Sequence, residues 1–472
     1  MNDAPRSNTG SPQKFTRALS GFGVIILTLS VLSPGVSVFV SGASIVQQAG
    51  SGAVLAFLIG GIVCYVQTSL GAELGAAYPT AGYDYASIGN AVGDWAGALT
   101  YIVSLVTLPM FLNTSAVGIA EYLHPIFPGI NDTLVTLITV GVVTLAALLN
   151  IRANEFITGI FMLIETAALL LVSFLGIAHT QPDAVQRIFH PMHMANGVWV
   201  AAGIGVIGVA VNSAAWAIAG ATQALMFSED MKKPQTVGRI IMLAFFITVV
   251  LECAPVAGTI IGAHNAQAVL SNKAPFETFL AESLPDFALK LVSLSIAIAI
   301  FNACLAGFVG IGRNVYAMGR TNLFAAPINR ALMRLTPRAQ APWVALLIIG
   351  MTTAAATFLS MKFKILMLAG NYTILTIFYA WGVWRGRRMG RTGQPHHLYR
   401  SPAFPLMVVL MIPILVLEIA ALWTDTDTGR PSLFIFIGLY LLAFLYYRFV
   451  LLRRPDGWRM EGPADIDALE GR

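Results

Sequence analysis

The sequence predicts an all-α integral membrane protein with twelve transmembrane helices, and three observations lead to that fold class. The first is composition: 57% of the 472 residues are hydrophobic and 11% are charged, with a mean hydropathy of +0.74. A soluble domain carries about 25% charged residues, so a soluble globular fold is excluded. The other two observations are the lengths of the apolar segments and the placement of the basic residues between them.

The apolar residues gather in segments that are long enough to cross a bilayer, which takes about 20 residues in a helix. The N-terminal tail lacks the apolar stretch and cleavage site of a signal peptide, so the first segment is expected to be a retained span. The twelve expected spans lie near 20–46, 53–77, 95–120, 132–150, 155–178, 198–227, 238–262, 288–318, 341–360, 364–384, 404–423 and 432–452.

The basic residues predict that both termini are cytoplasmic. With the N-terminus inside, 22 of the 28 lysine and arginine residues fall on the inside segments, as the positive-inside rule requires. The expected location is the plasma membrane or a bacterial inner membrane, crossed many times. The net charge of +5 is then explained by the basic residues that set the orientation in the membrane. Membrane lipids are the expected surroundings, and nucleic acid is not expected as a partner.

Two of the expected spans are interrupted. Ser33-Pro34-Gly35 stands in the middle of the first, and a run of small residues around Gly220 weakens the sixth. Proline removes a backbone donor and glycine loosens the helix. In hydrocarbon, each freed backbone group costs several kcal/mol unless something satisfies it. The broken ends expose amide hydrogens and carbonyl oxygens, which can hold an anion and a cation. A proline kink that serves packing alone is the alternative.

The spacing of the two interruptions predicts an inverted repeat. The broken helices are offset by five spans, an odd number, so the second copy enters the membrane from the opposite side, and a substrate is expected between them at the midplane. The sequence therefore predicts a five-plus-five repeat with broken helices one and six. The expected organisation is a cytoplasmic N-terminal tail (1–18), a first repeat with spans 1–5 (19–180), a second repeat with spans 6–10 (181–390), spans 11–12 (391–454) and a cytoplasmic C-terminal tail (455–472).

Three stretches resemble signatures of one transporter family. The first, GAELGAAYPTAGYDYASIGNAVGDWAGALTYI (71–102), has a Glu-Leu pair that ends span two, a Pro-x-Ala-Gly turn and an aromatic-rich start of span three. The second is AIAGATQALMFSEDMKKPQTVGR (217–239), and the third is GRNVYAMGRTNLFAAPINRALMRLTPRAQAPWVA (312–345). In this order and topology they resemble the amino acid–polyamine–organocation transporters of the amino acid permease type, over residues 20–454.

The resemblance implies transport of an amino acid or related small amine by alternating access. It places the substrate carboxylate on the break in span one and the amine on the carbonyls of span six. The usual span-one pattern is Gly-Ser-Gly-Ile-Phe, whereas this chain has Gly35-Val36-Ser37-Val38-Phe39. The residues that the resemblance assigns to the substrate site are Gly35, Val36, Ser37 and Val38 in span one, and Trp216, Ala217, Ile218, Ala219 and Gly220 in span six.

Two acidic residues within spans are candidates for proton coupling. Glu165 lies about ten residues into span five, roughly 15 Å along the helix and thus near the midplane. Ionisable residues in the membrane are costly, and a carboxyl that changes charge between states suits a proton-coupling role. Many members of the resembled family have a lysine at this place. Glu252 in span seven is the second candidate. The alternative for both residues is a protonated glutamate whose hydrogen bonds serve helix packing alone. Glu73, at the inner end of span two, is instead expected to form a structural ion pair or to cap the helix.

Polar and aromatic residues complete the expected site. Asn302 and Asn371 in spans eight and ten border the central site in this fold, although interior asparagines usually join helices by hydrogen bonds. Trp216 and Tyr372 are candidates to contact an ammonium, with interfacial anchoring as the alternative. Neither break carries an acidic residue, which favours a zwitterionic or singly charged substrate over a polyamine. No catalytic constellation, metal site or cofactor motif is apparent, so neither an enzyme nor a cofactor is expected.

The sequence thus predicts a secondary active transporter, with proton-coupled symport as the leading mechanism. An exchanger and a non-transporting nutrient sensor on the same fold are the alternatives, and a channel would need a continuous polar stripe that these spans do not show. Sodium coupling through backbone carbonyls and hydroxyls stays open.

Overall fold

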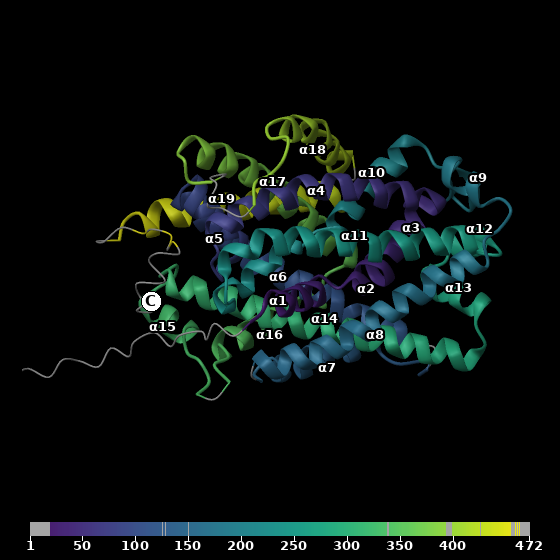
Figure 1. Cartoon of the computed structure of the whole chain (residues 1–472), viewed down its shortest axis with the longest axis horizontal. Helices are drawn as coiled ribbons and strands as arrows, with labels where there is room; N and C mark the ends of the chain where they lie inside the picture. The colour runs from purple at the N-terminus through teal and green to yellow at the C-terminus, as the bar shows by residue number, and fades with distance from the viewer. Residues whose placement is uncertain are drawn as a thin grey trace, which may run out of the picture.

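The computed structural model describes residues 19–454 apart from 125, 128, 150, 338, 393–398 and 425, together with 458, 460 and 462. The expected tails, 1–18 and most of 455–472, lie outside the described residues. Long helices run side by side along the molecule, with α9, α12 and α13 at one end and α5 and α15 at the other (Figure 1). These two ends are called the α9 end and the α5 end below.

Each of the twelve expected spans falls on one or more helices. Spans one to five are α1 (Gly21–Leu32), α2 (Pro34–Val36), the π-helix η1 (Ser37–Gly42), α3 (Ala43–Ala49), the 3₁₀ turn η2 (Gly50–Gly52), α4 (Ala53–Ala77), α6 (Asp94–Leu123), α7 (Asp132–Ala146) and α8 (Ile151–Ala178), with α5 (Tyr83–Val92) between spans two and three. A short hairpin, β1 (Met192–Ala195) and β2 (Val198–Ala201), follows α9 (Ala184–Phe189).

The second half continues in the same way. Its elements are α10 (Ile204–Ile218), the 3₁₀ helices η3 (Ala221–Asp230) and η4 (Pro234–Thr236), α11 (Val237–Gly262), α12 (Ala266–Leu270), α13 (Pro275–Ser283), α14 (Asp286–Arg320), α15 (Ala326–Leu332), α16 (Trp343–Ala356), α17 (Met361–Arg388), α18 (Leu406–Thr424), α19 (Gly429–Tyr446) and the π-helix η5 (Tyr447–Leu451).

Length and composition qualify eight stretches of the described chain as membrane spans, of which Gly21–Ala77 contains two of the expected ones. The helices α7 and α16 are apolar but shorter than the sequence predicts. The number of twelve crossings therefore stays a prediction, whereas the all-helical, multi-pass architecture is confirmed.

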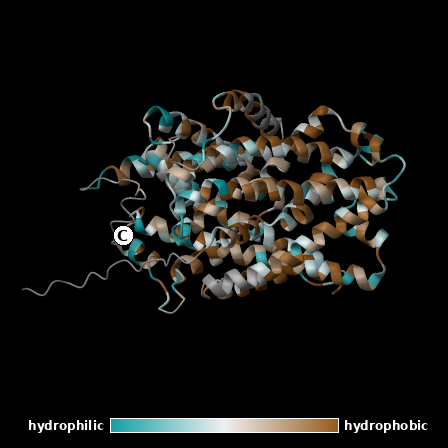
Figure 2. Ribbon diagram, in the orientation of Figure 1, coloured by the Kyte–Doolittle hydropathy of each residue, from teal (hydrophilic) through white to brown (hydrophobic). Residues whose placement is uncertain are grey.

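The outer surface of the bundle is apolar. Figure 2 shows hydrophobic residues along the middle of the helices and hydrophilic ones mostly towards the two ends. Large side chains such as Ile62, Leu163 and Phe246 are more than half exposed. A soluble protein rarely leaves so much apolar surface open, and a bilayer would cover it.

Both expected interruptions are present. The helix α1 ends at Leu32, and Ser33 takes a left-handed backbone with φ 43° before Pro34 starts α2. A residue before proline is disfavoured in the helical region, and proline at the first helical position loses no needed donor. The helix α10 ends at Ile218, and Gly220 has φ 128°, a conformation that residues with a side chain rarely adopt. The small and restricted residues predicted to break these helices do so.

The helices pack in pairs that recur between the two halves. α10 packs along α4 and α1 along α11; α8 packs along α11 and α17 along α4. Likewise, α6 contacts α7, α16 and α17, and α14 contacts α16, α7 and α8. If each span in such a pair is replaced by the span five positions earlier or later in the chain, the resulting pair is also in contact in the structure.

Arginine–carboxylate pairs tie the helices together at the α5 end. Glu73 on α4 accepts hydrogen bonds from Arg387 at 2.9 and 2.6 Å and from the Ser401 amide at 2.8 Å. The expected structural role of Glu73 is therefore confirmed. Two further buried pairs join η3 to α14: Glu229 with Arg320 at 2.7 Å and Asp230 with Arg313 at 3.0 Å.

Candidate functional site

A cavity lies where the two interrupted helices meet. Residues of both breaks line it, together with α4, α5, α6, η3 and α17. The space between its lining atoms, with the part that is open to solvent included, is about 790 Å³. A hydrogen bond joins the two breaks: the Ser37 hydroxyl donates to the Ala217 carbonyl at 2.8 Å. Gly220 also lies close to Leu32, since a Cβ added to the glycine would be 3.4 Å from the leucine side chain.

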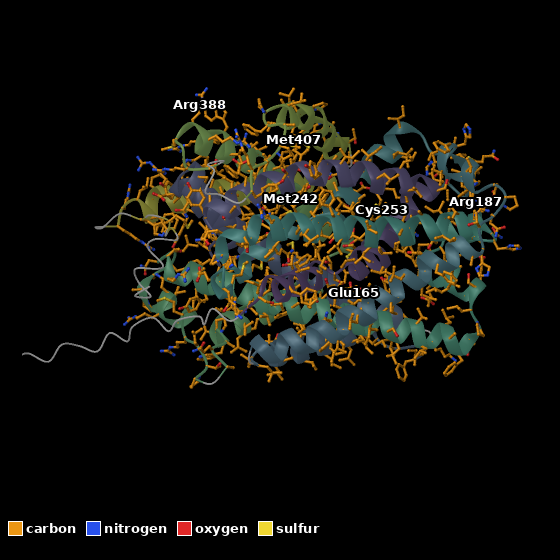
Figure 3. The ribbon with its side chains drawn as sticks, viewed as in Figure 1. Glu165, Arg187, Met242, Cys253, Arg388 and Met407 are labelled. Carbon is orange, nitrogen blue, oxygen red and sulfur yellow. The ribbon has the colours of Figure 1, made fainter. Side chains whose placement is uncertain are left out.

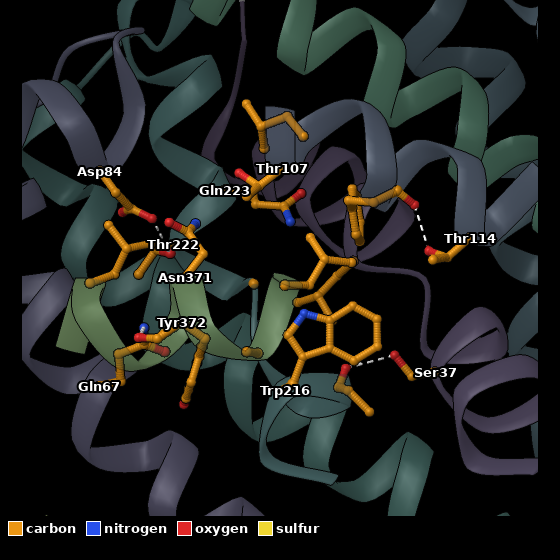
Figure 4. A pocket seen from close by; sticks show the side chains of 18 of the residues that line it. Ser37, Gln67, Asp84, Thr107, Thr114, Trp216, Thr222, Gln223, Asn371 and Tyr372 are labelled. Atoms are coloured by element: carbon orange, nitrogen blue, oxygen red, sulfur yellow. Dashed lines mark hydrogen bonds between the residues drawn. The ribbon is translucent and has the colours of Figure 1, made fainter. Parts of the chain in front are cut away.

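Most of the predicted substrate-site residues line this cavity. Those that do are Val36, Ser37, Trp216, Ala217, Ala219, Gly220, Asn371 and Tyr372. Gly35, Val38, Ile218 and Asn302 are not among the lining residues; Asn302 is buried within α14. Figure 4 shows Ser37 and Trp216 close together on one side of the cavity, and Asn371 and Tyr372 on the other.

Glu165 occupies the break in the first helix. It lies near the middle of the molecule, between Arg388 at the α5 end and Arg187 at the α9 end (Figure 3). One carboxyl oxygen, Oε1, accepts hydrogen bonds from the Gly35 amide at 2.6 Å and the Ser33 hydroxyl at 2.8 Å. The side chain is fully buried, and a Cβ on Gly35 would lie 2.9 Å from Oε1. The glycine therefore lets the carboxyl reach the backbone.

The remaining amides of the first break are also satisfied within the chain. The Val36 amide donates to Ser33 Oγ at 3.1 Å, and the Ser37 amide donates to the Ser33 carbonyl at 3.0 Å. The donors that the resemblance assigns to a substrate carboxylate are thus taken by the protein, and Glu165 takes the foremost of them.

Glu252 approaches the same break from α11. It is fully buried and within electrostatic range of Glu165. The Ser37 hydroxyl lies near Glu252, but it donates to Ala217 instead. Within the described part of the chain, Glu165 Oε2 and both carboxyl oxygens of Glu252 have no hydrogen-bond partner. Neither glutamate forms a salt bridge with a described lysine or arginine. The two predicted proton-coupling residues therefore converge on one helix break.

Asp84 is a lining residue that the sequence did not single out as a site. It comes from α5, between spans two and three, and only 1% of it is exposed. Thr222 donates a hydrogen bond of 3.0 Å to its Oδ2, and Oδ1 has no partner among the described residues. Burial raises the pKa of Asp84 to about 6, against the opposing effect of neighbouring hydroxyls from Tyr379, Tyr83 and Thr222.

Gln67, Thr222 and Gln223 also line the cavity without having been predicted as site residues. Gln67 donates to the Tyr372 carbonyl at 3.3 Å and so joins α4 to α17. Asp84 and Thr222 both fall within stretches that carry the family signatures, and that position in a signature is the one signal by which they could have been found.

Comparisons with known proteins agree with this geometry. The amino acid permease family model matches residues 19–445. The branched-chain amino acid permease BcaP of Lactococcus lactis subsp. cremoris is 24% identical over 451 residues, which cover 90% of this chain and 91% of the relative. Uncharacterised transporters of Mycobacterium bovis and Mycobacterium tuberculosis are 23% identical over 345 residues, or 73% of this chain and 74% of theirs. The chain therefore belongs to the amino acid permease family and is a multi-pass membrane transporter of amino acids, not an enzyme.

Proposed function

We propose that the protein is a secondary active transporter that moves its amino acid by alternating access together with a proton. The substrate binds in the cavity between the two breaks, and Glu165 carries the proton. The observation that supports this is the position of the Glu165 carboxyl on the Gly35 amide, which is the donor that the resemblance assigns to a substrate carboxylate. Gly35 directly precedes Val36 and Ser37, which line the cavity.

Competition for these donors would couple the proton to the substrate. When Glu165 is ionised, it holds the Gly35 amide and the Ser33 hydroxyl through charge-assisted bonds of 2.6 and 2.8 Å. Protonation weakens both bonds and leaves the donors to a substrate carboxylate. Binding of a proton at Glu165 and of a carboxylate at the break then favour each other, and linkage makes that coupling reciprocal.

The alternation itself would follow from a five-plus-five inverted repeat, residues 19–180 and 181–390. The packing pairs described above support this repeat, because a shift of five spans exchanges them with one another. The two helix interruptions occupy matching places in the two halves. Rocking of one half against the other would open the cavity first to one side of the membrane and then to the other.

The orientation in the membrane is proposed from charge. With both termini cytoplasmic, the α5 end faces the cytoplasm, and the location is the cell membrane. Arg388 and Arg187, expected on opposite sides of the membrane, lie at opposite ends of the molecule (Figure 3).

Uptake into sealed proteoliposomes tests the function. A panel of labelled amino acids would be measured with and without an inside-alkaline pH gradient, and it would include the branched-chain amino acids in the name of the lactococcal relative. The gradient should accelerate saturable uptake by the wild type. Glu165→Gln, which cannot ionise, should abolish the acceleration and keep uptake down a substrate gradient. Glu282→Gln, an exposed change on α13, is the matched control.

Other outcomes separate the alternatives. Uptake only into liposomes that are preloaded with amino acid would make the protein an exchanger, and Glu165 would then be a structural residue. Ligand binding without any movement of substrate would support the sensor. Acceleration that persists in Glu165→Gln would refute the role of Glu165 while leaving transport intact.

A further inference from the structure

Asp84 differs from three other buried acidic residues of the described chain. Glu73, Glu229 and Asp230 are buried and each is paired with an arginine. Asp84 is equally buried, yet within the described chain it forms no salt bridge, and its Oδ1 has no hydrogen-bond partner. An unpaired buried carboxylate costs several kcal/mol. Because Asp84 lines the cavity, a bound cation could supply the missing partner.

The local backbone holds Asp84 in this position at a cost. Tyr83 has φ 60°, a left-handed conformation that is unusual for a bulky residue. Its hydroxyl lies 3.2 Å from Thr222 Oγ1, which in turn donates to Asp84 Oδ2. Strained residues gather at functional sites, where the surrounding structure maintains them. The strained residue Tyr83 therefore directly precedes Asp84, whose carboxylate is held in place at the wall of the cavity.

A structural role of Asp84 in its own helix is the simpler alternative. The residue lies in the first turn of α5, where a negative charge is favoured by the helix dipole. That role requires neither burial nor a position on the cavity. Asp286 has the same place at the start of α14, but it is exposed and pairs with Lys290 at 2.8 Å.

The cavity has two polar ends of different chemistry. Figure 4 shows Ser37 and Trp216 on one side and Asp84, with Thr222 and Asn371 beside it, on the other. The first side holds the two helix breaks, whose carbonyls suit the amine of an amino acid and whose Gly35 amide suits its carboxylate once Glu165 is protonated, as proposed above. Among the described residues that line the cavity, Asp84 is the one with a formal charge, and aliphatic side chains such as Leu368 and Leu375 complete the wall.

We propose that Asp84 binds the terminal ammonium group of a cationic substrate, so that the transporter selects amino acids whose side chain ends in an amine. This rests on the proposed function, because it takes the cavity as the transport site. The same ammonium chemistry occurs in a basic amino acid and in the diamine that lacks its carboxylate. The breaks favour the amino acid, and the test below separates the two.

Binding and uptake of L-lysine and L-norleucine by the full-length protein test the proposal. The two amino acids share the same unbranched side-chain carbons, and lysine differs by the ammonium group at the end of that chain. The wild type should prefer lysine by more than about tenfold, as expected for a desolvated charge pair. Asp84→Asn should remove that preference by weakening lysine and leaving norleucine unchanged. Asp286→Asn, the matched first-turn control, should keep the preference.

Each result decides for or against the site. Equal binding of lysine and norleucine by the wild type would overturn the proposal and leave amino acid transport intact, even if Asp84→Asn fails to fold. An equal loss of both ligands in a folded Asp84→Asn would make the residue structural and would also overturn it. Cadaverine binding that depends on Asp84 would support the site and identify an amine as ligand, whereas lysine binding without cadaverine binding would identify the amino acid. If no amino acid moves at all, the proposed function itself fails.

Discussion

The two helix breaks face the same cavity but are completed in different ways. In the first, the side chain of Ser33 and the carboxyl of Glu165 take the freed amides. In the second, Gly220 passes through a left-handed turn, and no described acidic or basic side chain bonds to it. At the first break, the Glu165 carboxyl accepts the hydrogen bond of a freed amide. At the second, the backbone takes a conformation that only a residue without a side chain adopts readily. Under the proposed function, the first break exchanges the Glu165 carboxyl for the substrate carboxylate, and the second break offers its carbonyls to the substrate amine.

The largest effect is expected at the second break. Gly220→Ala places a Cβ on a residue with φ 128° and 3.0 Å from Gln223 Nε2. Such backbone strain costs about 1–3 kcal/mol, so kcat/KM for uptake should fall by up to about a hundredfold. Gly205→Ala in α10, where a Cβ meets open space, should change uptake little. Full activity of Gly220→Ala would mean that the turn is not needed for binding.

The next effect follows from the pH dependence of Asp84. With a pKa of about 6, this carboxyl is mostly protonated at pH 5 and mostly ionised at pH 7. Affinity for lysine, measured without a pH gradient, should therefore rise roughly tenfold between pH 5 and 7. Burial raises the pKa of its two neighbours on α5, Tyr83 and Tyr85, above the usual tyrosine value, so both stay neutral throughout that range.

Norleucine is the control for this measurement, because its affinity reports any titration elsewhere in the cavity. The Glu165 competition proposed above acts on the carboxylate that both ligands share, so it changes both affinities alike. The ratio of the two affinities isolates Asp84. A ratio that is constant from pH 5 to 7 would contradict the ammonium site.

A smaller effect is expected when the first break is disturbed from the backbone side. Gly35→Ala would bring a Cβ to within 2.9 Å of Glu165 Oε1 and push the carboxyl away. The pH-gradient acceleration of uptake should fall several-fold, which is less than the complete loss expected for Glu165→Gln. Since both changes act on one contact, the double variant should be no worse than the more affected single one. Additive losses would show that the two residues act separately.

The smallest effect is expected for Ser33→Ala. It removes the hydroxyl that caps the Val36 amide and donates to Glu165. Loss of such a cap costs about 1 kcal/mol, so the free energy of unfolding in detergent should fall by about that amount. Ser33→Thr keeps the hydroxyl and should recover most of the loss. Unchanged stability in Ser33→Ala would indicate that water replaces the cap.

The sequence predicted those parts of this picture that depend on local chemistry. The Ser33-Pro34-Gly35 sequence and the small residues around Gly220 weaken a helix locally, so both interruptions were predictable, although single prolines such as Pro109 and Pro255 lie within the continuous helices α6 and α11. The depth of Glu165 follows from counting residues along a helix, but its contact with Gly35, 130 positions away, depends on how α8 is rotated against α1. Asp84 was missed for a related reason: α5 folds back under the cavity, and nothing in the composition of the two breaks reveals an acidic residue that arrives from a third segment.

The start of the first span is joined to the exit of the sixth by two backbone hydrogen bonds. The Leu19 amide donates to the Asp230 carbonyl at 2.9 Å, and the Lys232 amide donates to the Leu19 carbonyl at 3.1 Å. If the two halves separate at the α5 end during transport, these bonds must open. Exchange of the Leu19 and Lys232 amide hydrogens with deuterated solvent would then record how often that face opens, with no label attached to the protein. The exchange rates of these two amides would therefore report how often the α5 end opens during the transport cycle.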